Sequence, residues 1–215
     1  FQPLVNYDSS INRTNSLIHF NEHTLQADYV HPVEKHTLEI GTKGIFRSNS
    51  SHYQYDGYDS EKQSFVRNKT LSNGFTYLQD IFAAYSSLNI ILANWGLKGG
   101  LRFEQTKTKA FFLSSGTFVD QDISNWVPNV IITKQTKETS IFKLSYNQRI
   151  ERPSLYFLNP YINVVDPKNI SYGNPKLVPA IYNLYDISYT YFTDQGSIYL
   201  GFHHSYTNNS ILQYT

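Results

Sequence analysis

Hydrophobic and polar residues alternate along much of the chain, with the period of two that is typical of β-strands. In the stretch SIFKLSYNQR, Phe142, Leu144 and Tyr146 fall on one side of an extended chain, and Lys143 and Asn147 fall on the other. The same pattern, noisier in places, recurs over residues 22–31, 36–46, 74–86, 95–104, 126–134, 180–192 and 196–206. Helical periodicity is nearly absent. The pattern therefore predicts an all-β fold of eight antiparallel strands.

The links between these strands fall into two classes. Short links are predicted at 31–36, 86–89, 134–138 and 193–196. Long polar links are predicted at 48–73, 105–125 and 150–180. An up-and-down meander with tight turns at one end and long loops at the other is typical of outer-membrane β-barrels, whose strands need only about 9–11 residues to cross the bilayer.

In a barrel wall, the apolar face of each strand meets lipid and the polar face meets the interior. A charge facing the bilayer midplane costs about 2–4 kcal/mol, so charged positions select the interior. We expect the lipid-facing set to include Leu97, Leu101, Phe142, Leu144, Tyr146, Leu200 and Phe202. We expect the interior set to include Lys98, Arg102, Glu104, Lys143, Asn147 and His203.

The loop pattern also predicts that these strands do not close into a ring. If the short turns are periplasmic, the first predicted strand descends and the last ascends, so both ends of the chain lie at the extracellular side. A complete bacterial barrel has an even number of strands and both termini in the periplasm. We therefore expect further strands beyond this segment, and no pairing between residues 22–31 and 197–212.

The amino-acid composition excludes several other kinds of protein. The 215 residues include 18 Tyr and 14 Phe, and Tyr suits an apolar surface that meets water. A formal charge of +1 argues against a nucleic-acid partner, which requires a concentrated basic face. There is no Cys for a disulfide, no apolar run of about 18 residues for a membrane-spanning helix, and no signal-peptide pattern in FQPLVNYDSS.

Candidate chemical groups do not assemble into a catalytic or metal site. His203 and His204 point to opposite faces of an extended strand, and His19 and His23 would need a helical turn to converge. The glycine runs lack the strand-then-helix context of a phosphate loop, and the paired aspartates lack companion ligands. The sequence therefore predicts no enzyme activity, no metal site and no cofactor.

Two consecutive stretches carry a family resemblance: YNQRIERPSLYFLNPY and YGNPKLVPAIYNLYDISYTY. They resemble a loop and the following strand near the C-terminal part of TonB-dependent outer-membrane receptors, especially the β-barrel family common in Bacteroidetes. The matching residues are Arg149, Arg152, Pro153, Ser154, Leu158, Asn159, Pro160, Gly173, Asn174, Pro175, Leu177 and Pro179. Ala180 replaces the usual acidic residue. Three further blocks follow the family in the same order: IFAAYSSL, GGLRFEQT and WVPNVII.

The resemblance implies that residues 1–215 are part of a larger barrel domain in the bacterial outer membrane, of about 22 strands with a plugged lumen. The partners that it implies are outer-membrane lipid, the remaining strands and plug of the same barrel, a periplasm-spanning energising protein that acts through the plug, and a surface lipoprotein. Neither the plug nor its energiser-binding motif is found in these residues.

The loop after residue 150 is the candidate ligand site. Its prolines fix φ and withhold N–H donors, and we expect Gly173 and Asn174 to adopt positive φ where the chain returns. The predicted ligand-binding residues are Arg149, Arg152, Tyr172 and Asn174. The alternative is a rigid cap that contacts no ligand.

Three functions remain open at this point. The first is uptake of a bulky nutrient, such as a metal chelate, glycan or peptide, through an energised outer-membrane barrel. The second is an outer-membrane barrel with a structural or assembly role. The third is a soluble β-sandwich that binds carbohydrate through exposed tyrosines.

Overall fold

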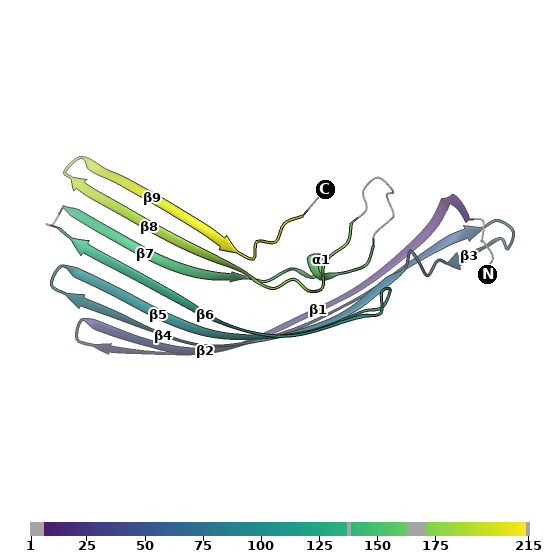
Figure 1. Ribbon diagram of the computed structural model, residues 1–215, viewed down its shortest axis with the longest axis horizontal. Helices are drawn as coiled ribbons and strands as arrows, with labels where there is room; N and C mark the ends of the chain where they lie inside the picture. The colour runs from purple at the N-terminus through teal and green to yellow at the C-terminus, as the bar shows by residue number, and fades with distance from the viewer. Residues whose placement is uncertain (1–6, 137–138, 163–170, 214–215) are drawn as a thin grey trace.

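The structure is a computed structural model that describes residues 7–136, 139–162 and 171–213. These residues form one curved antiparallel sheet (Figure 1). Its strands are β1 (Tyr7–Val33), β2 (His36–Asp59), β3 (Ser64–Arg67), β4 (Asn73–Leu92), β5 (Trp95–Phe112), β6 (Thr117–Gln135), β7 (Ser140–Glu151), β8 (Ala180–Thr193) and β9 (Gly196–Asn208). A four-residue helix, α1 (Leu155–Leu158), lies between β7 and β8. Among the described residues, no helical segment has the length and apolar character of a membrane-spanning helix.

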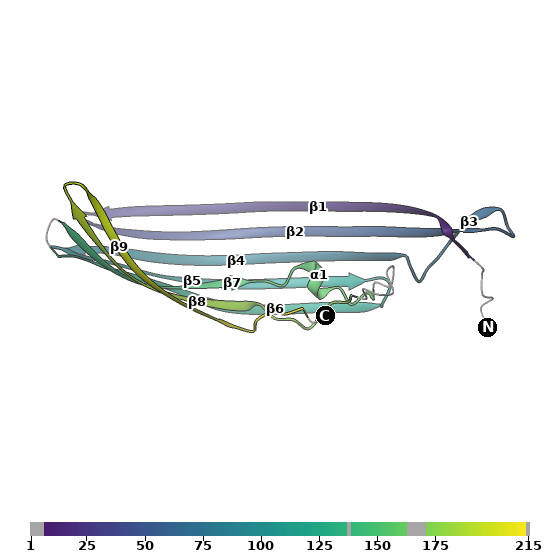
Figure 2. The same cartoon turned by 90° about the horizontal axis from the view of Figure 1, so that it is seen from above.

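The sheet is an open meander. Its order is β1-β2-β4-β5-β6-β7-β8-β9, and β3 pairs with the end of β2. In the described part of the chain, β1 pairs only with β2 and β9 only with β8, so the ring is not closed, as predicted. Figure 2 shows β8 and β9 inclined to β1 and β2, which is the twist expected of a wall that curves.

All eight predicted strands are present, but several are much longer than predicted. The first begins at Tyr7 rather than at residue 22, and the second continues to Asp59. The predicted long link at 105–125 is wrong, because β5 and β6 continue through it to a tight turn that contains Gly116, with φ +64°. Beyond the bilayer the outer face of a strand meets water and no longer needs apolar side chains. The ladder therefore continues through polar residues that carry no hydrophobic alternation.

The predicted turn at 86–89 is also wrong. These residues lie inside β4, and the turn is formed by Ala93 and Asn94, between Leu92 and Trp95. Ala93 has φ 49°, a left-handed conformation that is usually filled by Gly or Asn, so its residue type hid the turn. The predicted turns at 31–36 and 193–196 are confirmed.

The two predicted sets of side chains lie on opposite faces of the sheet. Leu101 pairs with Ser86 and Pro128, whereas Arg102 pairs with Tyr85 and Val127. Directly opposed residues point to the same side, so the register extends each face across neighbouring strands. The face that carries Glu104 is termed the inner face, and the face that carries Leu101 the outer face.

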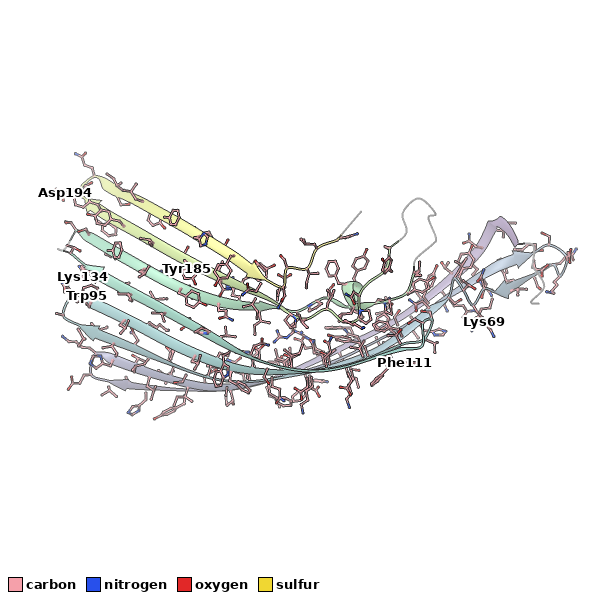
Figure 3. All side chains as sticks on the ribbon, in the orientation of Figure 1. Lys69, Trp95, Phe111, Lys134, Tyr185 and Asp194 are labelled. Atoms are coloured by element: carbon pink, nitrogen blue, oxygen red, sulfur yellow. The ribbon has the colours of Figure 1, made fainter. Side chains whose placement is uncertain are left out.

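The outer face of β5 carries an apolar band between Trp95 and Phe103. Trp95 and Lys134 lie side by side at the end of the sheet with the short turns (Figure 3). There, Lys134 Nζ is 4.3 Å from the centre of the Trp95 ring. At the other border, the rings of Phe103 and Trp126 are 4.9 Å apart. Aromatic residues border the lipid-facing surface of membrane barrels in this way, and the band has about the 9–11 residues that a tilted strand needs to cross.

On the inner face, the side chain of Tyr85 crosses over Gly41 of the neighbouring strand. The Tyr85 hydroxyl in β4 reaches over Gly41 in β2 and donates a hydrogen bond to the carboxylate of Asp28 in β1. Gln26 Nε2 also donates to Asp28, at 2.7 Å. A Cβ at residue 41 would overlap the Tyr85 ring. Because Gly41 has no side chain, the Tyr85 hydroxyl can cross β2 and link β4 to β1.

Replacing Leu101 with Arg should lower the free energy of barrel unfolding by about 2 kcal/mol or more, because it brings a charge into the apolar band. Urea unfolding of the whole barrel in lipid vesicles measures this. Phe111→Arg, on the same strand and face but beyond the band, is the control and should cost about 1 kcal/mol or less. Equal losses would contradict the assigned position of the bilayer.

Replacing Gly41 with Val should destabilise the sheet by about 1–3 kcal/mol, because the new side chain displaces Tyr85 from Asp28. The matched variant is Gly99→Val, since an added Cβ there meets nothing within 4 Å and faces outward. That variant should stay within about 0.5 kcal/mol of the parent. An unchanged unfolding midpoint for Gly41→Val would show that the Tyr85 bridge does not stabilise the sheet.

Candidate functional site

The described parts of the β7–β8 loop, residues 152–162 and 171–179, pack against the inner face of the sheet. Figure 1 shows α1 on the concave side, over the ends of the middle strands. Leu158 of α1 is 3% exposed, and it belongs to a buried apolar cluster with Tyr77, Ala110, Phe112 and Val119. Phe75, Leu155 and Leu177 pack around this cluster. The described part of the loop is therefore held by a small apolar core of its own on the inner face.

Glu104 fixes the beginning of this loop. Its side chain is 7% exposed, and it forms ion pairs with Arg102 Nη2, at 2.8 Å, and with Arg152 Nη2. Arg152 also donates to Thr106 Oγ1, at 3.2 Å from Nε and 3.1 Å from Nη2. A buried carboxylate requires such partners, because an unpaired buried charge is strongly destabilising.

Further polar side chains extend this contact across the sheet. Arg47 in β2 contacts Glu22 of β1 at 2.6 Å and donates to Gln79 Oε1 of β4 at 3.0 Å. Gln79 Nε2 then donates to Thr108 Oγ1 of β5, at 3.3 Å. These residues and the Glu104 group form a polar belt on the inner face: Glu22, Arg47, Gln79, Arg102, Glu104, Thr106, Thr108 and Arg152.

The loop arginine keeps its charge within this belt. Burial, together with the nearby cations of Arg47 and Arg102, lowers the pKa of Arg152 to about 10. The guanidinium is therefore protonated at neutral pH, and its attraction to Glu104 is present under physiological conditions.

The return of the loop depends on close backbone contacts. The N–H groups of Gly173 and Asn174 donate to the carbonyls of Asn159 and Phe157, each at 2.7 Å. A Cβ at residue 173 would lie 2.7 Å from the Asn159 carbonyl oxygen. The prediction of positive φ at Gly173 and Asn174 is wrong, since neither is among the described residues with positive φ. Glycine is needed there for close approach rather than for a left-handed turn.

The sheet also holds the loop backbone directly. Gln121 Nε2 of β6 donates to the carbonyls of Pro175 and Leu177, at 3.3 and 3.2 Å. The prolines remove backbone donors from this segment but leave carbonyls, and a side chain of the wall satisfies two of them.

A polar inner face, an apolar outer band and an open, curved meander together describe a section of a membrane barrel. The description of the outer membrane protein beta-barrel family matches residues 2–215. The chain belongs to this family. It is therefore a protein of the outer membrane, and the soluble β-sandwich that its composition left open is wrong.

Solved structures agree with this family on the fold. The alcaligin outer membrane receptor FauA from Bordetella pertussis superposes with a TM-score of 0.58 at 15% identity, over 92% of this chain and 31% of FauA. The ferric yersiniabactin uptake receptor FyuA from Yersinia pestis gives 0.61 at 13% identity, over 91% and 30%. The unliganded ferric citrate transporter FecA gives 0.56 at 13%, over 84% and 26%. No curated protein matches the chain.

These values show a shared fold, and the chain spans less than a third of the length of each of the three proteins. The proteins are named as receptors and a transporter rather than as enzymes.

The predicted site residues of this family member lie in different surroundings. Arg152 belongs to the polar belt, and Arg149 is an exposed residue of β7 opposite Tyr182. Tyr172 is 76% exposed, and the Asn174 side-chain oxygen accepts a hydrogen bond from the N–H of Lys176, at 2.9 Å. Ligand binding by these four residues stays a prediction.

Only part of the predicted set is brought together. Tyr172 lines a shallow pocket of about 170 Å³ with Tyr156, Asn159, Tyr161, Ser171 and Gly173. Neither predicted arginine is part of that lining. The loop thus divides into an arginine that anchors it and an outward tyrosine cluster.

Two residues that hold the loop, Thr106 and Gln121, were not recognised from the sequence, because they fall in the stretch that was predicted to be a long link. Thr108, which belongs to the polar belt, falls in the same stretch. The available signal was the spacing of Glu104, Thr106, Thr108 and Ala110 at every second residue, which continues the inner face beyond the apolar band.

His203 and His204 point to opposite faces of β9, as predicted. His203 Nδ1 contacts Asp186 Oδ1 at 2.6 Å on the inner face. His204 lies on the opposite side, near the rings of Tyr185 and Tyr206. Within the residues that the structure describes, no group of three or more His, Asp or Glu side chains is arranged to hold a metal ion.

Replacing Glu104 with Gln should release the β7–β8 loop, because Arg102 and Arg152 lose a buried counter-charge. We expect a loss of about 2–3 kcal/mol in the stability of the whole barrel and faster trypsin cleavage after Lys176. Glu39→Gln is the matched control: its ion pair with Lys98 is about two-fifths exposed on both sides and should contribute less than about 1 kcal/mol. Cleavage at the parent rate in the Glu104 variant would contradict the proposed anchor.

Proposed function

We propose that this chain is part of the wall of an energised outer-membrane importer that takes up a bulky nutrient, such as a metal chelate, a glycan or a peptide. The observation that carries the proposal is the inner face. A polar belt crosses β1, β2, β4 and β5, and the β7–β8 loop is bound to it from the inside through Arg152. A wall of this kind suits a wide lumen that is lined by water and protein.

The names of the similar solved structures also support a role in uptake. The printed names of FauA, FyuA and FecA describe receptors or transporters of alcaligin, ferric yersiniabactin and ferric citrate. At 13–15% identity these names do not transfer a ligand, so the nutrient class in this proposal is kept broad. The proposed partners are a plug within the barrel, a periplasm-spanning energising protein that acts through the plug, and a surface lipoprotein that closes over the loops.

The competing function is a barrel with a structural or assembly role. Both functions need the same outer band and the same closed ring of strands. They differ in whether the inner face handles a solute and whether energy is needed. The β7–β8 loop is the part of this chain best placed to matter for an importer, because it lies inside the wall and carries Tyr156, Tyr161 and Tyr172 on its surface.

Growth on a limiting nutrient tests the proposal. Deleting the barrel should abolish growth on one nutrient among ferric chelates, oligosaccharides and peptides, and deleting the energising protein should have the same effect. A small sugar that crosses through general pores is the control and should support both strains equally. If the barrel deletion instead weakens the membrane toward detergents, while every nutrient still supports growth, the structural role is correct.

A further inference from the structure

A groove lies on the outer face near the extracellular ends of β2, β4 and β5. β2 pairs with β4 only as far as Tyr53–Asn73, and β3 takes its place from Asp56–Arg67, so the sheet has a step between them. A cavity of about 370 Å³ occupies this step. A second cavity of about 220 Å³ continues from it and shares His52 and Leu113.

The first cavity is cationic. Arg67 and Lys69 both line it, and its lining contains no carboxylate. The nearest acidic partner, Asp56, is already paired with Arg13 at 2.9 Å and lies 3.9 Å from Arg67. Among the described residues no ion pair includes Lys69, and Figure 3 shows it on the convex side of the sheet. The pocket therefore has positive charge in excess.

Neutral polar groups surround these cations. Asn73 lines the cavity, but its pairing with Tyr53 continues the inner-face row of Ser51–Phe75, so its side chain is not part of the outer surface. Gln54 Nε2 donates to Asp56, which leaves its oxygen as an acceptor. Amide groups of this kind suit sugar hydroxyls, and charge-assisted hydrogen bonds from Arg and Lys suit phosphate or carboxylate.

The adjoining cavity supplies an apolar wall. Leu17, Phe111 and Leu113 line it, and Gly74 lies on its floor without a side chain to fill it. The ring of Phe111 lies on the outer face, as Figure 3 shows. An apolar ring next to cations and amides is a combination that fits the carbon face of a sugar better than a free inorganic anion.

The distance of the groove from the apolar band indicates which part of the membrane surrounds it. On β5, the stretch from Phe103, at the border of the apolar band, to Leu113 is roughly 33 Å long at 3.3 Å per residue. A strand tilt of about 45° places the groove roughly 23 Å beyond the band. At that height, the outer face of an outer-membrane barrel lies among the sugars of the surface glycolipids rather than among acyl chains.

We propose that this groove binds an acidic saccharide, that is, a phosphorylated or carboxylated sugar, and that its source is the core of the lipopolysaccharide around the barrel. Arg67 and Lys69 bind the acidic group, Gln54 binds a hydroxyl, and Phe111 supports the ring. The site lies on the outside of the wall, so it is separate from the proposed uptake path and does not depend on it.

Binding of lipopolysaccharide to the complete barrel in detergent tests this site. The probes are lipopolysaccharide with a phosphorylated core, the same material after dephosphorylation, and glucose 6-phosphate as a free acidic sugar. The double variant Arg67→Gln/Lys69→Gln should weaken binding of the phosphorylated material by about tenfold or more, and Lys69→Glu alone should also weaken it. The matched control is Lys107→Gln/Lys109→Gln, which removes the same charge from the same face nearer the band.

Four results distinguish the cases. Weakened binding in the groove variants only, for phosphorylated lipopolysaccharide only, supports the membrane glycolipid as the source. Weakened binding of glucose 6-phosphate as well supports the same site with a free sugar as an additional source. Equal weakening in the control variant overturns the proposal, because binding then reflects general positive charge. Unchanged binding in both groove variants overturns it as well. Heat-modified mobility on gels shows that each variant is folded.

Discussion

Every long strand of this chain has to satisfy two environments at once. Its outer face meets hydrocarbon, where neither a charge nor an unpaired backbone group is tolerated, and its inner face meets polar material. An antiparallel ladder with a side-chain period of two meets both demands, and a slip of one residue would bring Arg102 and Glu104 into lipid. The register of the sheet is therefore fixed by the apolar band, and the position of the polar belt follows from that register.

The polar belt in turn holds the β7–β8 loop in place. Without contacts to the sheet, the segment between β7 and β8 would be surrounded by water and would keep a large conformational entropy. Glu104 supplies a charge for Arg152, and Tyr77, Phe112 and Val119 supply an apolar seat for Leu158. Both contacts come from the same face of the same few strands. The described part of the loop is consequently attached to the wall at two points, and Tyr156 lies between them in the chain.

The fold and both faces could be predicted because lipid imposes a strong pattern on the sequence. Leu97, Leu101 and Phe142 alternate with charged residues, and the structure places them as predicted. The pattern fades once the strands leave the bilayer, so the continuation of β5 through Thr106 and Thr108 was not recognised. Ala93 hid a turn, because its left-handed backbone is not typical of its residue type. Pairing between Glu104 and Arg152 depends on a return of the chain that no local pattern encodes.

The connectivity of the sheet has a consequence for the order in which the molecule forms. Each long strand pairs with the next long strand along the chain, so the sheet grows through hairpins with little loss of chain entropy at each step. The loop after β7 is different, since its seat is built from β4, β5 and β6, all of which precede it. Docking of the loop is therefore a late event in assembly. Until it occurs, Glu104 and the aromatic residues beside it are open to any other segment that enters the barrel.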